Sequence, residues 1–323
     1  MQQQLIVAII AGLVSVLCYG SVLTGSTLAI VPFYLAAVPL YIAGLGWGWV
    51  TAFAAAAASV IVLAFFGGTV PSLAFLAVLA APAAWFSYLL LLARPGANQT
   101  DIEWYPPGRL LVWMAGIACL YLVAAYVALG GSAQTLHLGI RNAMTAAAQN
   151  NPGMTGLPPP EEFDAYAALF VRLIPMAGVI SWMLNHIMCI YLAGRMLRAA
   201  GRLRRPWPVL RAIAAPRMAI AALCLALLGG WLSDFAGFLL LGAAAGFLFV
   251  QTLIGLAVMH TVTLTSSVRP VILTAVYLVL ALLSWPALVL ALLGIADNFF
   301  GLRAKALARK GPPSSPPPPA TGG

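Results

Sequence analysis

Runs of apolar residues, each long enough to cross a membrane, alternate with short polar stretches along the whole chain. A helix needs about 20 mostly apolar residues to span the hydrocarbon core of a bilayer. The pattern predicts nine such segments, of which eight or nine cross; they lie at about 5–23, 28–43, 47–66, 70–92, 109–129, 165–192, 218–232, 235–259 and 270–295. The predicted fold class is therefore all-α, a polytopic transmembrane helix bundle with 8–9 spans.

The polar stretches predict connections of different kinds. Residues 94–108 form a polar connection that ends in Pro106-Pro107. The longest insertion, residues 130–164, predicts a weakly amphipathic helix on the membrane surface over 133–149 and an Asn-, Pro- and Gly-rich loop over 150–160. Residues 311–323 consist mostly of Pro, Ser and Gly, a composition typical of disorder.

These patterns divide the chain into four expected parts. Residues 1–193 form a six-helix membrane core that carries the insertion at about 130–164, and residues 194–217 form a basic cytoplasmic linker. Residues 218–300 supply C-terminal transmembrane helices. Residues 301–323 form a tail that is first basic and then rich in proline.

Composition supports a membrane protein and argues against a nucleic-acid-binding one. Of the 323 residues, 63% are hydrophobic and only 7% are charged, whereas a soluble domain carries about 25% charged residues. The net charge of +9 comes from basic residues that cluster in loops between apolar segments. Such clustering is the positive-inside pattern of cytoplasmic loops.

The arginines also predict an orientation. Seven of them lie close together, namely Arg195, Arg198, Arg202, Arg204, Arg205, Arg211 and Arg217. They place this linker and the N-terminus in the cytoplasm, and the 130–164 insertion outside. A conflict remains at the other end: nine crossings put the tail outside, whereas Arg303, Lys305, Arg309 and Lys310 favour the inside. The side of the tail is therefore left open.

Polar residues at membrane depth are the candidates for a ligand-binding site, because they are costly to bury in lipid. They are Arg172, Trp182, Asn185, His186 and Gln251. Helical spacing places Trp182, Asn185 and Cys189 on one face. The alternative is that these groups form hydrogen bonds between helices and hold no ligand. Asp234 is expected to cap the segment that follows it.

Small residues four positions apart allow helices to approach closely in lipid. Ala8 with Gly12, and Gly242 with Gly246, have this spacing. They serve either for helix packing within the chain or as a face for a partner protein.

Catalytic signatures are missing from the sequence: it contains no HExxH, G-x-S-x-G or Walker A motif. His186 and Cys189 are too few ligands for a metal site. We therefore expect no enzyme, no metal and no cofactor, although a lipid-processing enzyme is kept as a third alternative.

Two regions resemble the YybS-like family of predicted bacterial membrane proteins, a domain of unknown function. The first combines Ala8 and Gly12 with a short second helix bearing Pro32 and Pro39, a Gly-rich turn and an Ala-rich third helix. The second comprises the run from Gln251 to Val258 and the ending from Leu293 to Arg303. The resemblance implies a multi-pass protein of the bacterial inner membrane.

That family is distantly similar to the S components of energy-coupling-factor transporters, which implies an S-component-like core of about six helices plus extra C-terminal helices. In S components the small residues of the first helix contact a membrane partner subunit, and Ala8 and Gly12 match that spacing. The expected function is to bind or transport a small molecule. The alternative is a non-transport membrane scaffold or assembly factor that acts through protein or lipid contacts.

Overall fold

A computed structural model describes residues 2–96, 101–150, 158–232 and 234–308. Part of the predicted loop at 150–160 and the whole predicted disordered tail at 311–323 lie outside the described residues. The helices of the first half are α1 (Gln2–Gly20), α2 (Ile30–Tyr34), α3 (Val38–Trp47), α4 (Trp49–Gly67), α5 (Thr69–Phe75), α6 (Ala81–Leu91), α7 (Pro107–Ala128) and α8 (Ala133–Asn150). The remaining ones are α9 (Phe163–Ala199), α10 (Met218–Gly229), α11 (Asp234–Val262), α12 (Arg269–Leu282), α13 (Pro286–Phe300) and α14 (Leu302–Ala308).

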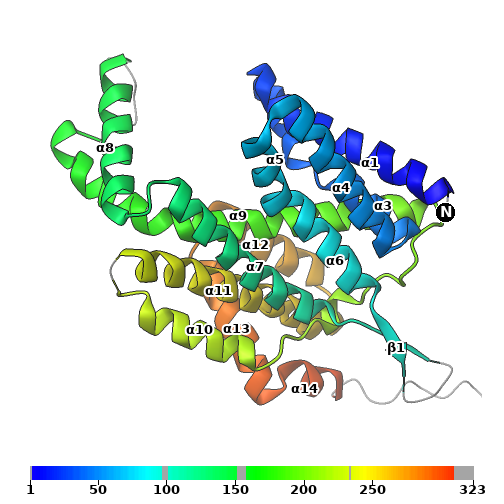
Figure 1. The fold of residues 1–323 in the computed structure, drawn as a ribbon. Helices are drawn as coiled ribbons and strands as arrows, with labels where there is room; N and C mark the ends of the chain where they lie inside the picture. The colour runs from blue at the N-terminus through cyan, green and yellow to red at the C-terminus, as the bar shows by residue number, and fades with distance from the viewer. Residues whose placement is uncertain (1, 97–100, 151–157, 233, 309–323) are drawn as a thin grey trace, which may run out of the picture. The chain divides into compact units, whose positions relative to one another are not determined.

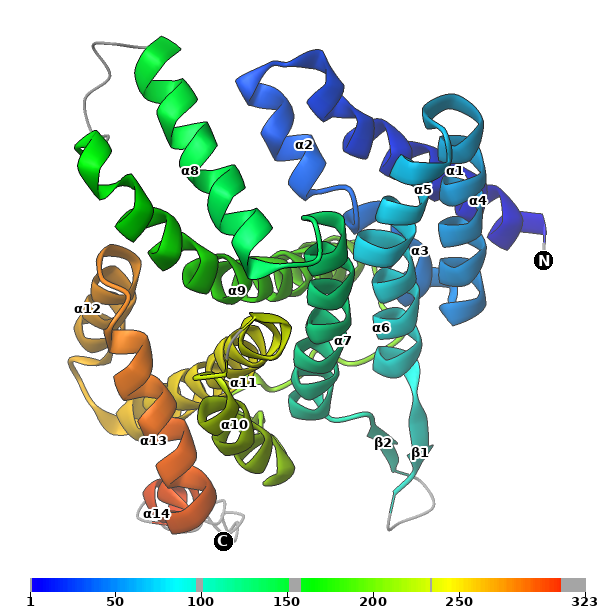
Figure 2. The same ribbon diagram turned by 60° about the vertical axis from the view of Figure 1, so that its left-hand side comes forward.

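The architecture is the predicted all-α polytopic bundle (Figures 1 and 2). Seven helical segments of the described chain are long and apolar enough to cross a membrane: Gln2–Thr24, Thr27–Trp47, Trp49–Gly67, Thr69–Leu91, Pro107–Ala128, Pro160–Ala199 and Asp234–Thr265. The count rises to eight if α13 and α14, which meet at a 70° bend, form one span. Helices α10 and α12, with 12 and 14 residues, fall short of that length, so the upper expectation of nine is not reached.

The contact pattern divides the chain into two compact units. The first comprises residues 1–208 and 214–247, and the second comprises residues 209–213 and 248–323. The boundary falls inside α11, between Phe247 and Leu248.

The N-terminal helices of the first unit pack through small residues. Helix α1 lies against α4, where Gly12 approaches the carbonyl oxygen of Ala55 so closely that an added Cβ would come within 2.9 Å of it. Helix α3 lies between α4 and α9, and Gly44 of α3 faces Ser87 of α6 in the same manner. Close backbone approach supplies the van der Waals contact that holds helices together in lipid.

A short antiparallel ribbon occupies the polar connection at 94–108, which the sequence pattern did not predict as strands. Strands β1 (Ala93–Pro95) and β2 (Ile102–Trp104) pair with Arg94 opposite Glu103. The Arg94 Nε and Glu103 Oε2 atoms are 2.8 Å apart. Oppositely charged cross-strand neighbours stabilise such a pair, although three-residue strands are too short to show alternation in the sequence.

Helix α9 is the longest element, with 37 residues. At 1.5 Å per residue it is about 55 Å long, which exceeds the roughly 30 Å of a hydrocarbon core. Its first turns pack against α8, whose Leu136 is buried (Figure 2). The predicted helix over 133–149 is confirmed; its placement on the membrane surface stays a prediction.

Ala214 and Asp234 contact opposite ends of α7. At one end Gly108 of α7 lies against the backbone of Ala214, with no room for a side chain between them. At the other end the Tyr126 hydroxyl donates a hydrogen bond to the Asp234 carboxylate. Helix α10, with 12 residues, lies in the chain between these two contacts.

In the second unit, glycines bring α11 and α13 into backbone contact. Gly255 abuts the carbonyl of Leu290, and Gly294 abuts the carbonyl of Gln251. The Thr252 hydroxyl donates to the Ala287 carbonyl oxygen at 3.1 Å. A turn at Gly301, with φ of 60°, then starts α14.

Candidate functional site

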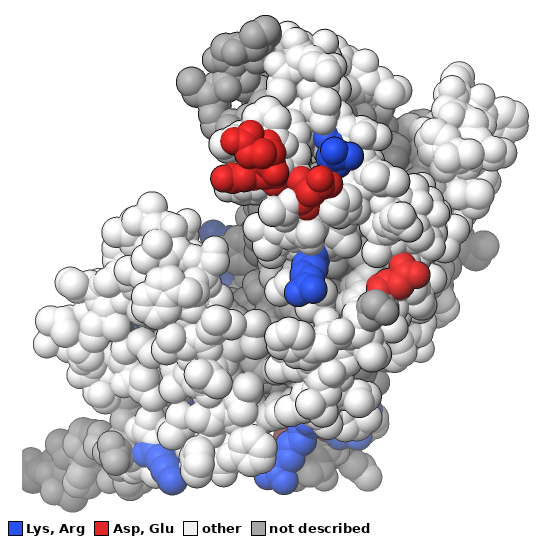
Figure 3. Space-filling view, turned by 90° about the vertical axis from the view of Figure 1, so that its left-hand side faces the viewer, with Lys and Arg blue, Asp and Glu red and all other residues white. Residues whose placement is uncertain are grey.

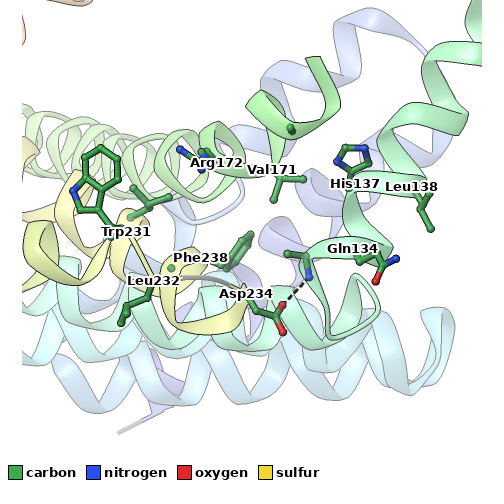
Figure 4. A pocket seen from close by; sticks show the side chains of 14 residues that line it. Gln134, His137, Leu138, Val171, Arg172, Trp231, Leu232, Asp234 and Phe238 are labelled. Carbon is green, nitrogen blue, oxygen red and sulfur yellow. Dashed lines mark hydrogen bonds between the residues drawn. The ribbon is translucent and has the colours of Figure 1, made fainter. Parts of the chain in front are cut away.

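A pocket of about 520 Å³ opens in the first unit where three elements meet (Figure 4). Helix α8 contributes Gln134 and His137, and α9 contributes Arg172. The turn after α10 contributes Trp231, and the start of α11 contributes Phe238. In Figure 4, Arg172 and Trp231 lie toward one side of the pocket and Gln134 and His137 toward the other. The volume lies within the range of small-molecule sites.

Asp234 holds the wall of this pocket together. Its carboxylate accepts hydrogen bonds from the backbone N–H of Ala133, at 2.9 Å, and from the hydroxyl of Tyr126. Ala133 is the first residue of α8, so Asp234 satisfies an N–H group at the start of α8. Its backbone has a left-handed φ of 56°, and its described hydrogen bonds go to α8 and Tyr126; capping of α11 stays a prediction.

Arg172 is the free cation of the pocket. Asp164 is paired with both His137 Nε2 and Arg141 Nε, each at 3.2 Å. Arg172 is exposed, and it forms no ion pair with any residue that the structure describes. Figure 3 shows acidic side chains beside basic ones on an otherwise uncharged face. An unpaired guanidinium beside aromatic rings is suited to an anion with an apolar part.

Two of the predicted ligand-binding residues meet inside the first unit, around one backbone oxygen. The Trp182 Nε1–H donates to the Val78 carbonyl oxygen at 2.9 Å, and His186 Nε2 lies 3.0 Å from the same oxygen. The Tyr41 hydroxyl lies 2.7 Å from His186 Nδ1. Tyr41 and His186 are fully buried, and Trp182 is buried with its indole against the imidazole.

This geometry defines the tautomer of His186. A carbonyl oxygen can only accept, so Nε2 carries the proton and donates to Val78. Nδ1 of the neutral ring then accepts from the Tyr41 hydroxyl. The carbonyl oxygen of Val78 is available to accept these hydrogen bonds because Val78 lies in the π-helical turn Leu76–Ala80, where the regular helical bonding pattern is interrupted.

Arg172 and Asn185 lie apart from that cluster. Fourteen positions separate Arg172 from His186 on α9, which corresponds to about 21 Å along a helix. Asn185 is half-buried and its Oδ1 lies 3.9 Å from the Cys189 Sγ, which is also 3.4 Å from the Tyr34 carbonyl oxygen. Trp182 and Cys189 are both buried on α9, as their predicted shared face implies, and Asn185 contacts Cys189 from a half-buried position.

Gln251 lies in the second unit and does not line the pocket at Arg172. Its side chain is fully buried, and neither its amide nitrogen nor its amide oxygen has a hydrogen-bond partner among the described residues. An unpaired buried amide costs free energy.

The small-residue pairs are used for packing within the first unit. Ala8 and Gly12 are buried, with Gly12 facing α4. Gly242 approaches Leu122 of α7 and Pro175 of α9, and Gly246 approaches Val179 of α9.

Sequence reasoning identified only Arg172 among the residues around the open pocket. It missed the wall residues Gln134, His137, Trp231 and Phe238, and the backbone oxygen of Val78. The Gly229-Gly230-Trp231 turn was the one available signal, since an aromatic residue after two glycines indicates an interfacial turn. In the described residues, no three His, Cys, Asp or Glu side chains are grouped as metal ligands.

The fold and these sites define a polytopic integral membrane protein. Residues 12–298 match the family described as predicted membrane protein (DUF2232), and the chain belongs to this family. The family resemblance seen in the sequence is thereby confirmed. No curated protein and no solved structure matches the chain.

Proposed function

We propose that this protein binds a small anionic molecule with an apolar part, in the pocket between α8, α9 and the α10–α11 turn. The observation that carries the proposal is the exposed Arg172 guanidinium, without an acidic partner in the described chain, beside Trp231 and Phe238. The cation attracts an anionic group, and the aromatic rings favour an apolar or planar portion of the ligand.

The orientation predicted from the arginines would place this pocket on the extracytoplasmic side, because it borders the 130–164 insertion. Such a position suits a protein that captures a ligand from outside. The distant resemblance to S components that the sequence suggests would add transport of the captured ligand, driven by a partner subunit.

Replacing Arg172 by Gln tests the proposal. Wild type is screened by thermal shift against vitamins and anionic metabolites, and we expect some to raise its melting temperature. The Arg172→Gln variant should lose about tenfold or more in affinity for those compounds, because one charge-assisted hydrogen bond is worth about 1.5–3 kcal/mol. Arg195→Gln is the matched control, since Arg195 is an exposed arginine of the same helix outside the pocket. No shift with any anionic compound, or equal shifts in both variants, would contradict the proposal.

One observation favours the alternative, a scaffold that acts through the basic linker. Arg205 is buried and donates to the carbonyl oxygens of Leu90 and Tyr105, at 3.0 and 2.9 Å, which gives the linker a defined path. Arg195, Arg198 and Arg202 remain exposed. Crosslinking in native membranes from a cysteine at Arg195 would trap a neighbouring protein if this alternative holds, and would yield only the monomer if it does not.

A further inference from the structure

A second cavity in the first unit is lined mainly by apolar side chains. An apolar groove of about 640 Å³ runs along α7, and we call it the α7 groove. Its lining residues on α7 are Val112, Trp113, Gly116, Ile117 and Leu120, and the facing residues are Pro216, Met218 and Phe247. Most of this lining consists of apolar side chains, as expected of a surface that receives a hydrocarbon chain.

A smaller, more polar cavity of about 260 Å³ adjoins the α7 groove, and we call it the head pocket. Arg94, Glu103 and Trp104 line it, and Tyr105 and Arg109 line both cavities. The Trp113 Nε1–H donates to the Tyr105 hydroxyl at 3.0 Å, so an aromatic pair stands where the two cavities join. Tyr and Trp are the side chains that favour the level of lipid headgroups.

The charge at this junction is positive. Glu103 is already paired with Arg94, whose hydrogen bond and charge lower the pKa of the Glu103 carboxyl, with a smaller electrostatic contribution from Arg109. Arg109 is exposed and forms no ion pair with any described residue. Arg217, also exposed, lies in the chain between the groove residues Pro216 and Met218. Arg109 therefore lines both cavities, and Arg217 is the chain neighbour of two groove residues, so positive charge from two segments borders the groove.

Gly116, which has no side chain, leaves open space in the α7 groove for an acyl chain. An added Cβ at Gly116 would meet no atom within 4 Å, so the space beside it is open. Leu120 and Met218, further along the lining, are largely exposed. In a bilayer such a surface is covered by lipid tails, which fill apolar grooves between helices.

We propose that the α7 groove and the head pocket together bind one anionic phospholipid, with its phosphate at Arg109 and Arg217 and an acyl chain against Gly116. Charge complementarity favours an anionic lipid, because each arginine near the headgroup strengthens the free energy of binding by about 1 kcal/mol, which is about a fivefold gain in affinity. The site is separate from the pocket at Arg172 and shares no lining residue with it.

The test measures lipid binding by purified full-length protein in detergent. Phosphatidylglycerol, phosphatidylcholine and glycerol 3-phosphate are titrated, with melting temperature and lipid retained in native mass spectrometry as readouts. We expect phosphatidylglycerol alone to raise the melting temperature of wild type. Removing both cations in Arg109→Gln/Arg217→Gln should weaken its binding about 25-fold, the product of two fivefold effects.

Gly116→Phe fills the groove and should abolish retention of phosphatidylglycerol. Gly178→Phe is its matched control, because Gly178 also lies in a long helix with no atom within 4 Å of an added Cβ, yet lines none of these cavities. Arg195→Gln controls for the loss of one surface charge. Equal retention by Gly116→Phe and Gly178→Phe, equal binding of phosphatidylcholine, or an equal effect of glycerol 3-phosphate would overturn the proposal.

Discussion

At the scale of residues, the most constrained group in the first unit is His186. Both of its ring nitrogens have partners, Tyr41 and Val78, and the ring is fully buried. Such a satisfied imidazole is suited to fixing the positions of α3, the π-helical turn and α9 relative to one another. It leaves no free nitrogen for a ligand, so the cluster supports packing within the bundle.

Removing the Tyr41 hydroxyl tests this role. Tyr41→Phe leaves Nδ1 of His186 unpaired in an apolar interior, and we expect a loss of about 0.6–2 kcal/mol in the free energy of unfolding. Unfolding in mixed detergent micelles measures it. Tyr191→Phe is the control, because the exposed Tyr191 hydroxyl has no hydrogen-bond partner in the described chain. Equal stability of the two variants would show that the bond contributes nothing.

At the scale of elements, the start of α8 depends on an acid from a distant helix. Asp234 binds the Ala133 N–H, and the Ser132 hydroxyl oxygen accepts from the Thr135 N–H at 3.0 Å. Together they satisfy two of the N–H groups that an isolated helix start leaves free. Because Asp234 also binds Tyr126 at the end of α7, one side chain positions a wall of the Arg172 pocket.

Asp234→Ala should therefore loosen α8. We expect a loss of local stability, seen as faster hydrogen exchange of the amides in the first turn of α8. Asp234→Asn is the control, since its amide oxygen still accepts and asparagine tolerates positive φ. Exchange in the alanine variant as slow as in wild type would refute this role of the carboxylate.

Elements differ in how far their sequence predicted them. The long spans followed from apolar run length, and the helix over 133–149 followed from its amphipathic pattern, because both are local properties. The sequence pattern did not predict the ribbon β1–β2, because two three-residue strands are stabilised by pairing with each other and not by their own residue pattern. For the candidate site, the sequence identified Arg172 because a cation at membrane depth is costly to bury in lipid. The predicted ligand-binding residues do not form one site, however, because Arg172 lies far from His186 along α9.

At the scale of the whole molecule, the side of the C-terminal tail can be argued from contacts within the second unit. Arg303 forms an ion pair with Asp297, with 2.7 Å between Nη2 and Oδ2, and its Nη1 donates to the carbonyl oxygens of Arg211 and Ile213 at 2.9 and 2.7 Å. Asp297 is thus an anchor at the end of α13. The beginning of the tail therefore lies with the basic linker, as its own basic residues favour.

Cysteine labelling tests this topology. In a variant lacking the four native cysteines, Arg195→Cys, Lys305→Cys and Gln3→Cys should react from one side of the membrane, and Gln134→Cys from the other. The reason is that Arg303 binds the linker, and that six crossings separate the N-terminus from it. Labelling of positions 195 and 305 from opposite sides would contradict this arrangement.

By itself the sequence determined the class of protein, its principal spans, the family and the clustering of positive charge. These depend on run length and local composition, because every helix in lipid must satisfy its own backbone and bury about 20 apolar residues. Only the tertiary structure decided the rest. Tyr41 lies 145 residues from His186, and Tyr126 lies 108 residues from Asp234. Which polar groups become partners, and where cavities remain open, depends on how distant helices pack, and no local pattern encodes those contacts.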